Sequence, residues 1–247
     1  MDSQCNDFID RSFRDVADAD YIAARICWKR QLDFQFYWMA EQAVEKYLKG
    51  IMLYSRIDVR RLNHDLPRAL QEAVKIADIG LEPEKWLISF IDLLNQQGQN
   101  RYFECNLRVK GDELLLLDKC VWHIRIRCVA LDSTAERGGK LIWTSEQHFK
   151  KIKEFKTGDK PRNIWIPFGK LEKILSGESE SRRDLTWKNF WFGRYSKGEI
   201  KWRNEARYAY PAHVNTPAIF RELNKLVKFS PKTTAHFSEN ATKSCGS

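Results

Sequence analysis

The run from Phe36 to Leu70 constrains the fold more than any other part of the chain. Within it, apolar residues recur at spacings of three and four, at Tyr37, Ala40, Val44, Tyr47, Leu48 and Ile51. This is the 3.6-residue period, so one apolar stripe follows a helix of about four turns. Glu45 and Lys49 stand four residues apart, in the favourable order, on the face that we expect to point outward. Because the stripe must be covered, the run predicts a core helix of an α-helical domain.

Four further segments show helical periodicity or helix boundaries. With the central one, the expected helices cover residues 7–30, 34–54, 66–78, 83–97 and 112–131. Asp65 and Pro67 form a capping signal before the third helix, and Gly80 and Gly98 end the third and fourth. Short links between helices predict an up-and-down bundle.

The first of these helices carries acidic residues away from its apolar stripe, at Asp15, Asp18 and Asp20. A solvated acidic face is the ordinary interpretation of such a pattern. A site built on paired carboxylates is the alternative.

The two halves of the chain differ in charge. Residues 1–132 hold 19 of the 42 Lys and Arg and 21 of the 33 Asp and Glu, a net charge of −2. The remaining residues hold 23 basic and 12 acidic side chains, a net charge of +11. This asymmetry indicates a polyanionic partner for the second half.

We therefore expect a bundle over 1–132, a smaller basic and aromatic α+β module over 133–230, and a disordered tail over 231–247. In the module, residues 133–140 are expected to be a linker and 176–184 a polar loop. Helices are expected at 143–155, 168–175 and 217–229, a strand at 164–166 and a hairpin at 191–202.

Basic and aromatic residues alternate between positions 187 and 208. Cations neutralise phosphates and rings stack on unpaired bases, so this segment is a candidate RNA-binding surface. Its candidate residues are Lys188, Trp191, Arg194, Tyr195, Lys201 and Arg203. The alternative is that the rings fill a small β core while the cations coat its outside, and both can hold together.

Several classes of site and of compartment have no support in the sequence. No stretch approaches 18 uncharged apolar residues, and the acidic N-terminus is unlike a secretory signal. Six cysteines without a CxxC pair indicate reduced thiols in a cytoplasmic protein rather than disulfides or zinc. No phosphate-binding loop, dinucleotide fingerprint or HExxH is present, so we expect no cofactor and no metal.

The run AEQAVEKYLKG from Ala40 to Gly50, followed by His64-Asp65-Leu66, resembles the HEPN (higher eukaryote and prokaryote nucleotide-binding) domain family. Residues 18–25 look like its first helix, Asn100-Arg101-Tyr102 like its basic-aromatic turn, and 117–125 like its last helix. The resemblance covers about residues 8–131. It implies a homodimeric helical bundle that binds RNA or a nucleotide.

The candidate contacts in this half are His64, Asp65, Arg101 and Tyr102. The alternatives are that His64 and Asp65 merely satisfy a helix N-terminus, and that Arg101 pairs with an acidic helix.

Many HEPN proteins are metal-independent ribonucleases whose motif is Arg, four to six residues, then His, on a helix. Here Arg60 leaves only three residues before His64, so the helical half lacks the motif. One formal match runs from Arg207 to His213, but Pro211 would break a helix there.

We therefore expect a nucleotide- or RNA-binding HEPN protein without the usual nuclease motif. One alternative is an active metal-independent ribonuclease of a toxin or defence system. Another is a non-catalytic interaction scaffold that partners a nucleotidyltransferase.

Overall fold

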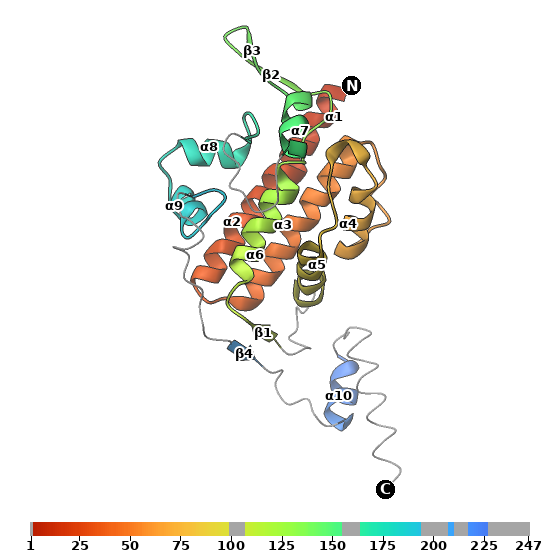
Figure 1. The fold of residues 1–247 in the computed structure, drawn as a ribbon. Helices are drawn as coiled ribbons and strands as arrows, with labels where there is room; N and C mark the ends of the chain where they lie inside the picture. The colour runs from red at the N-terminus through yellow and green to blue at the C-terminus, as the bar shows by residue number, and fades with distance from the viewer. Residues whose placement is uncertain (1, 99–106, 155–163, 194–206, 210–216, 227–247) are drawn as a thin grey trace. The chain divides into compact units, whose positions relative to one another are not determined.

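A computed structural model describes the chain except for residues 1, 99–106, 155–163, 194–206, 210–216 and 227–247 (Figure 1). The chain divides into two compact units. The first comprises residues 1–99 and 112–202, and the second comprises 100–111 and 203–247. The boundary expected at residue 132 does not coincide with this division, because elements on both sides of it lie in the first unit.

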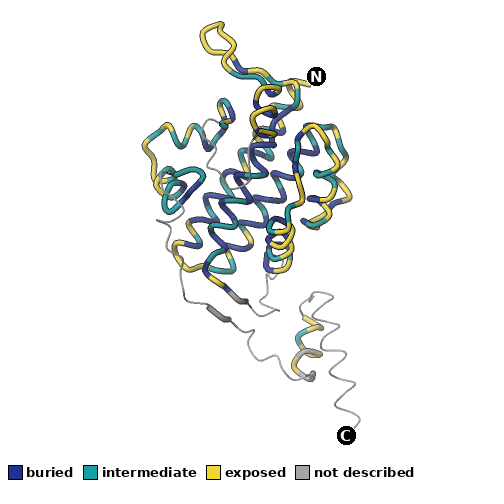
Figure 2. Tube along the Cα trace, in the orientation of Figure 1, coloured by how far each residue is buried: buried dark blue, intermediate teal, exposed yellow. Residues whose placement is uncertain are grey.

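The first unit is built on a long helical hairpin. Helix α1 (Asp2–Ile9) passes through a π-helical turn, η1 (Asp10–Arg14), into α2 (Asp15–Lys29). After a short connection, α3 (Asp33–Tyr54) follows, close to the expected 34–54. Its apolar stripe is buried as predicted, with Val44 and Leu48 fully inaccessible to solvent. Figure 2 shows burial continuing along α2, α3 and α6.

Three more helices complete the bundle: α4 (Leu66–Val74), α5 (Lys85–Gly98) and α6 (Glu113–Arg125). A 3₁₀ turn, η2 (Ala77–Ile79), follows α4 and ends at Gly80, whose φ of 58° lies in the left-handed region. The capping signal before α4 is confirmed, because the Asp65 side chain accepts a hydrogen bond from the Arg68 backbone N–H at 3.1 Å.

The rest of the first unit follows α6 along the chain. Strands β2 (Thr134–Arg137) and β3 (Lys140–Thr144) form an antiparallel hairpin, followed by α7 (Ser145–Glu154), α8 (Lys170–Ser176) and α9 (Glu180–Thr186). Helices α8 and α9 contact α2. In the second unit, β1 (Leu107–Val109) pairs antiparallel with β4 (Arg207–Ala209), and α10 (Pro217–Asn224) follows. The expected fold class, mainly helical with a smaller part containing strands, is confirmed.

Three local expectations for the second half were wrong. The expected linker at 133–140 is most of the β2–β3 hairpin, whose turn is Gly138-Gly139 with φ of 58° and 72°. Paired strands need two φ-positive residues there, which glycine adopts without strain. The expected loop at 176–184 contains the start of α9, capped by Ser179. Residues 164–166 are not a strand. The expected hairpin at 191–202 lies largely outside the described residues, and the tail at 231–247 wholly so.

Asp18 was expected on a solvated face, and this was wrong, because its side chain is 0% exposed. Its carboxylate accepts hydrogen bonds from Arg125 Nε at 2.7 Å and Nη2 at 2.9 Å, and from the Tyr47 hydroxyl at 2.5 Å. The Leu171 backbone N–H donates to it as well, at 3.2 Å. A fully partnered carboxylate tolerates burial, so this one ties α8 to the bundle.

A second buried ion pair ties α9 to the bundle. The Arg25 guanidinium donates to Asp118, to the Asp184 carbonyl oxygen at 3.0 Å and to the Trp187 carbonyl oxygen. Tyr21 donates to the same Asp118 carboxylate at 2.6 Å. Burial raises the pKa of Asp118, while Arg25 opposes the rise.

None of the described helices has the length and apolar character needed to cross a membrane.

Candidate functional site

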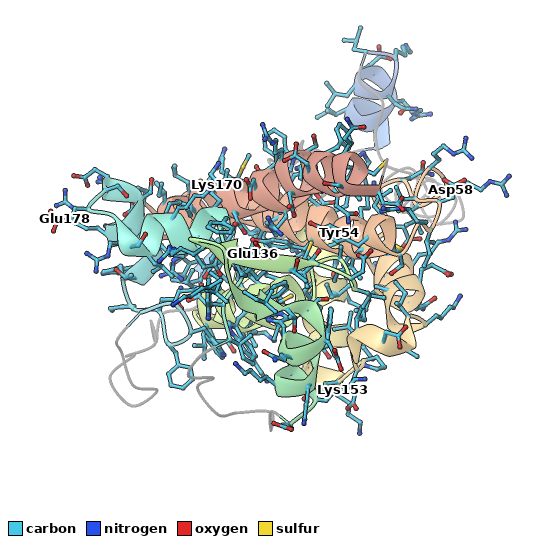
Figure 3. All side chains as sticks on the ribbon, turned by 90° about the horizontal axis from the view of Figure 1, so that it is seen from above. Tyr54, Asp58, Glu136, Lys153, Lys170 and Glu178 are labelled. Atoms are coloured by element: carbon cyan, nitrogen blue, oxygen red, sulfur yellow. The ribbon has the colours of Figure 1, made fainter. Side chains whose placement is uncertain are left out.

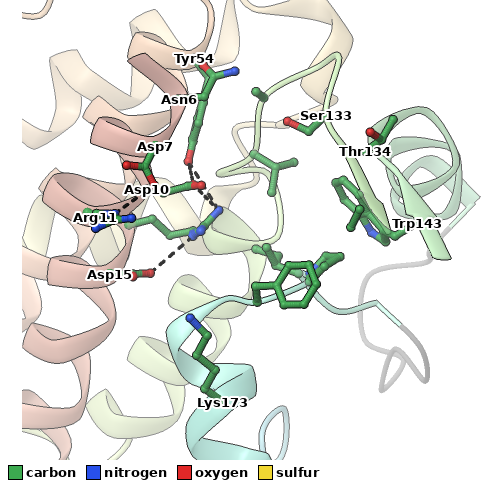
Figure 4. Close-up of a pocket in the computed structure, with 17 residues that line it drawn as sticks. Asn6, Asp7, Asp10, Arg11, Asp15, Tyr54, Ser133, Thr134, Trp143 and Lys173 are labelled. Atoms are coloured by element: carbon green, nitrogen blue, oxygen red, sulfur yellow. Dashed lines mark hydrogen bonds and ion pairs between the residues drawn. The ribbon is translucent and has the colours of Figure 1, made fainter. Parts of the chain in front are cut away.

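A pocket of about 580 Å³ opens where the start of the chain meets the second half of the first unit (Figure 4). Its walls come from α1, η1, the end of α3, the β2–β3 hairpin, the segment 166–168 and α8. Figure 3 labels Tyr54 of α3 and Glu136 of β2, which belong to two of these elements. The charged side chains of the lining are balanced in number, with Arg11, Arg14 and Lys173 against Asp7, Asp10 and Asp15.

The π-helical turn gives the pocket its floor. The Asp15 backbone N–H bonds to the Asp10 carbonyl oxygen, five residues earlier, instead of four. This inserts one extra residue into the helix, a distortion that is frequent at functional sites. Asp10, Arg14 and Asp15 all line the pocket.

Arg14 is the most buried of these three residues and is only 6% exposed. Its Nη1 is 2.5 Å from Asp10 Oδ1 and 3.5 Å from the Tyr54 hydroxyl oxygen, and that hydroxyl donates to Asp10. Burial lowers the pKa of the guanidinium, but Tyr54 and Asp10 outweigh it and raise the pKa above its ordinary value. Burial also raises the pKa of Tyr54, so the phenol keeps its proton as a donor.

Two polar atoms in the floor have no hydrogen-bond partner among the described residues: Arg14 Nε and Asp15 Oδ1. They lie 3.8 Å apart, too far for a hydrogen bond with each other. Burial raises the pKa of Asp15, and Arg14 opposes the rise. Buried polar atoms are nearly always paired, so a ligand that accepts from Arg14 and donates to Asp15 would complete both.

The rim of the pocket carries Lys173 and two aromatic side chains, in addition to the exposed Arg11–Asp7 pair. Lys173 of α8 is exposed, and Trp143 of β3 is half-buried. Phe168 is 53% exposed and has a φ of 60°, in the left-handed region that a bulky residue seldom adopts. The rim therefore offers a positive charge and two aromatic rings to a ligand.

The start of α8 is held in place by Arg125. This arginine bonds Glu172 at 2.8 Å and 2.7 Å, in addition to Asp18. Gly169 permits this approach, because a Cβ there would lie 2.3 Å from Glu172 Oε2 and 3.0 Å from Arg125 Nη2. The buried ion pairs thus fix the positions of Phe168 and Lys173 at the rim.

Most of the residues predicted as a site lie elsewhere or outside the described residues. Arg101, Tyr102, Arg194, Tyr195, Lys201, Arg203 and His213 are outside them. Arg207 lies in strand β4 and not on a helix, so the formal Arg–His match lacks the helical setting of the motif. Asp65 caps α4, and Lys188 and Trp191 do not line the pocket.

Glu45 was expected on an outward face, and this was wrong, because it is buried beside His64. The two side chains approach to 3.0 Å between Glu45 Oε2 and His64 Nδ1. Lys49 bonds the other Glu45 oxygen at 2.5 Å. The periodicity of α3 could not show that His64, from outside this helix, would cover Glu45.

Sequence reasoning missed Arg14, Tyr54 and Lys173. The i, i+4 spacing of Asp10 and Arg14 was the one local signal, and it reads equally well as a surface ion pair. Comparison with known proteins gives no match to a family model, to a curated protein or to a solved structure.

Proposed function

We propose that this pocket binds a nucleotide, either free or as one unit of an RNA strand. The observation that carries the proposal is the pair of buried atoms Arg14 Nε and Asp15 Oδ1, which lack a hydrogen-bond partner among the described residues, in a pocket whose rim has one lysine and two rings. A volume of about 580 Å³ falls within the ordinary range for small-molecule sites.

Each part of a nucleotide has a partner of matching chemistry. We assign the phosphate to the exposed Lys173 ammonium, and the base to the ring of Trp143 or Phe168. Arg14 Nε donates to a base carbonyl or ring nitrogen, and Asp15 accepts from an amino or hydroxyl group. A ligand carrying only negative charge would be repelled by Asp10 and Asp15, which favours a nucleotide over inorganic phosphate.

We also propose that the chain is a HEPN-like homodimer, as its sequence resemblance implies. A nucleotide-binding pocket agrees with that resemblance. So does the net charge of +11 beyond residue 132, which would attract further phosphates of a strand. A ribonuclease or a scaffold has no specific observation in its favour among the described residues.

The proposal is tested by titrating the full chain with the four nucleoside monophosphates and a short single-stranded RNA, using calorimetry. Lys173→Met and Phe168→Asn should each weaken binding by about tenfold, in the range measured for lost stacking and phosphate contacts. Lys170→Met is the matched control, because Lys170 lies on the same helix and does not line the pocket. No binding up to about 1 mM, or equal losses in both lysine variants, would refute the proposal.

A further inference from the structure

Three side chains with metal-binding atoms gather away from the pocket: Glu41 and Glu45 of α3 and His64 of the loop before α4. One ligand atom from each lies within 4.8 Å of the others. We propose that this Glu41–Glu45–His64 cluster binds a divalent transition-metal ion. The proposal is independent of the nucleotide pocket, since none of the three residues lines it.

The two carboxylates are built into the fold. Spaced four residues apart, they lie on one face of α3, where Glu41 is 1% and Glu45 5% exposed. Gly98, at the end of α5, makes room for the first, because a Cβ there would come within 2.5 Å of Glu41 Cβ. Two carboxylates this close repel each other. A divalent cation bound by both would offset this repulsion, because it attracts each of them.

The histidine is brought to them by an anchored loop. Lys49 Nζ donates to the Asn63 carbonyl oxygen at 2.8 Å, and Asp65 caps α4 immediately after the loop. His64 is therefore fixed at its backbone on both sides. Its side chain is 57% exposed, so an ion can reach the cluster from solvent.

The approach of His64 to Glu45 suits a small ion with mixed ligands. Two ligand atoms at about 2.1 Å from a tetrahedral ion lie roughly 3.4 Å apart, close to the 3.0 Å between His64 Nδ1 and Glu45 Oε2. Carboxylate with imidazole suits zinc or manganese, whereas magnesium and calcium prefer oxygen ligands alone. Three protein ligands leave a further position for water.

The experiment is zinc titration of the chelator-treated full chain by calorimetry, with magnesium in parallel. We expect one zinc ion per chain and no magnesium binding. His64→Ala should weaken zinc binding by at least about tenfold. Asp65→Asn is the matched control, since it alters the neighbouring carboxylate but keeps an N-capping oxygen, and it should leave the affinity unchanged.

A further variant tests the buried carboxylate directly. Glu45→Gln should weaken zinc binding by at least about tenfold, because an amide replaces a carboxylate ligand. Lys49 is left unchanged, because its Nζ pairs with Glu45 Oε1 at 2.5 Å and also anchors the loop that carries His64. Unchanged melting temperatures of the zinc-free variants establish that each one is folded.

Three results would overturn the proposal. One is the absence of zinc binding below roughly 100 μM. Another is zinc affinity that is the same in wild type and His64→Ala, which would assign the ion to other ligands such as the cysteines. The third is an intense thiolate band in the spectrum of the cobalt-loaded protein, because this cluster holds only oxygen and nitrogen ligands.

Discussion

Replacing Asp18 with asparagine tests whether the buried ion pairs hold the first unit together. The carboxylate is completely buried and accepts four hydrogen bonds, two of them from Arg125. In Asp18→Asn an amide N–H₂ replaces one oxygen and faces donors, and the buried Arg125 charge loses one of its two counter-ions, keeping only Glu172. Breaking a buried ion pair from one side costs about 3–5 kcal/mol, a large part of a total stability of ~5–15 kcal/mol.

The assay is urea unfolding followed by tryptophan fluorescence and circular dichroism. With a slope of about 3 kcal/mol per molar urea, the midpoint should fall by roughly 1–2 M. Asp20→Asn is the control, because Asp20 lies on the same helix and pairs with Lys46 at 2.7 Å nearer the surface. That pair should contribute at most about 1 kcal/mol. Equal midpoint shifts for the two variants would show that the Asp18 contacts do not stabilise the fold as described.

Three other outcomes follow from contacts already described. A chain ending at Leu131 should show a lower melting temperature than the full chain, because Asp18, Arg25 and Arg125 lose partners that lie beyond it. Phe168→Asn should keep the unfolding free energy within about 1 kcal/mol of wild type, since the relief of a left-handed conformation offsets the burial lost with an exposed ring. Burial, with Arg127 and Lys119, lowers the pKa of His123 to about 3, so only the unfolded chain takes up this proton between pH 6.5 and 3. The free energy of unfolding should therefore decrease as the pH is lowered from 6.5 to 3, by up to about 1.4 kcal/mol per pH unit. In His123→Gln, urea titrations should show a shallower dependence of this free energy on pH.

The sequence predicted the parts of the fold that depend on local patterns. Apolar periodicity placed α3 to within a residue, and the Asp65 signal placed the start of α4. It failed for Asp18 and Glu45, because periodicity assigns every polar residue to the outside. Whether a carboxylate is buried depends on donors from distant segments, and Leu171 is 153 residues away from Asp18.

The candidate pocket was harder to predict than the bundle. A π-helical turn differs from an α-helical one by a single residue, and no pattern in residues 10–14 distinguishes them. The Gly138-Gly139 turn was a signal that could have been used, since adjacent glycines between two β-forming runs favour a two-residue hairpin. The segment after Trp187 was interpreted from its alternating cations and rings and from its hairpin pattern, and most of it lies outside the described residues.

Residues that form the buried ionic contacts lie far apart in the sequence, and this affects how the chain folds during synthesis on the ribosome. Arg25 donates hydrogen bonds to carbonyl oxygens 159 and 162 residues further along the chain, and Asp18 accepts one from Leu171. These bonds can form only after the later residues have been synthesised. At about 5–20 residues per second, synthesis needs roughly 8–30 s to supply Leu171 after Asp18. During that interval the nascent helices carry charges still lacking these C-terminal partners. We therefore expect the N-terminal bundle to be less stable, and more accessible to chaperones, until α8 and α9 have been translated.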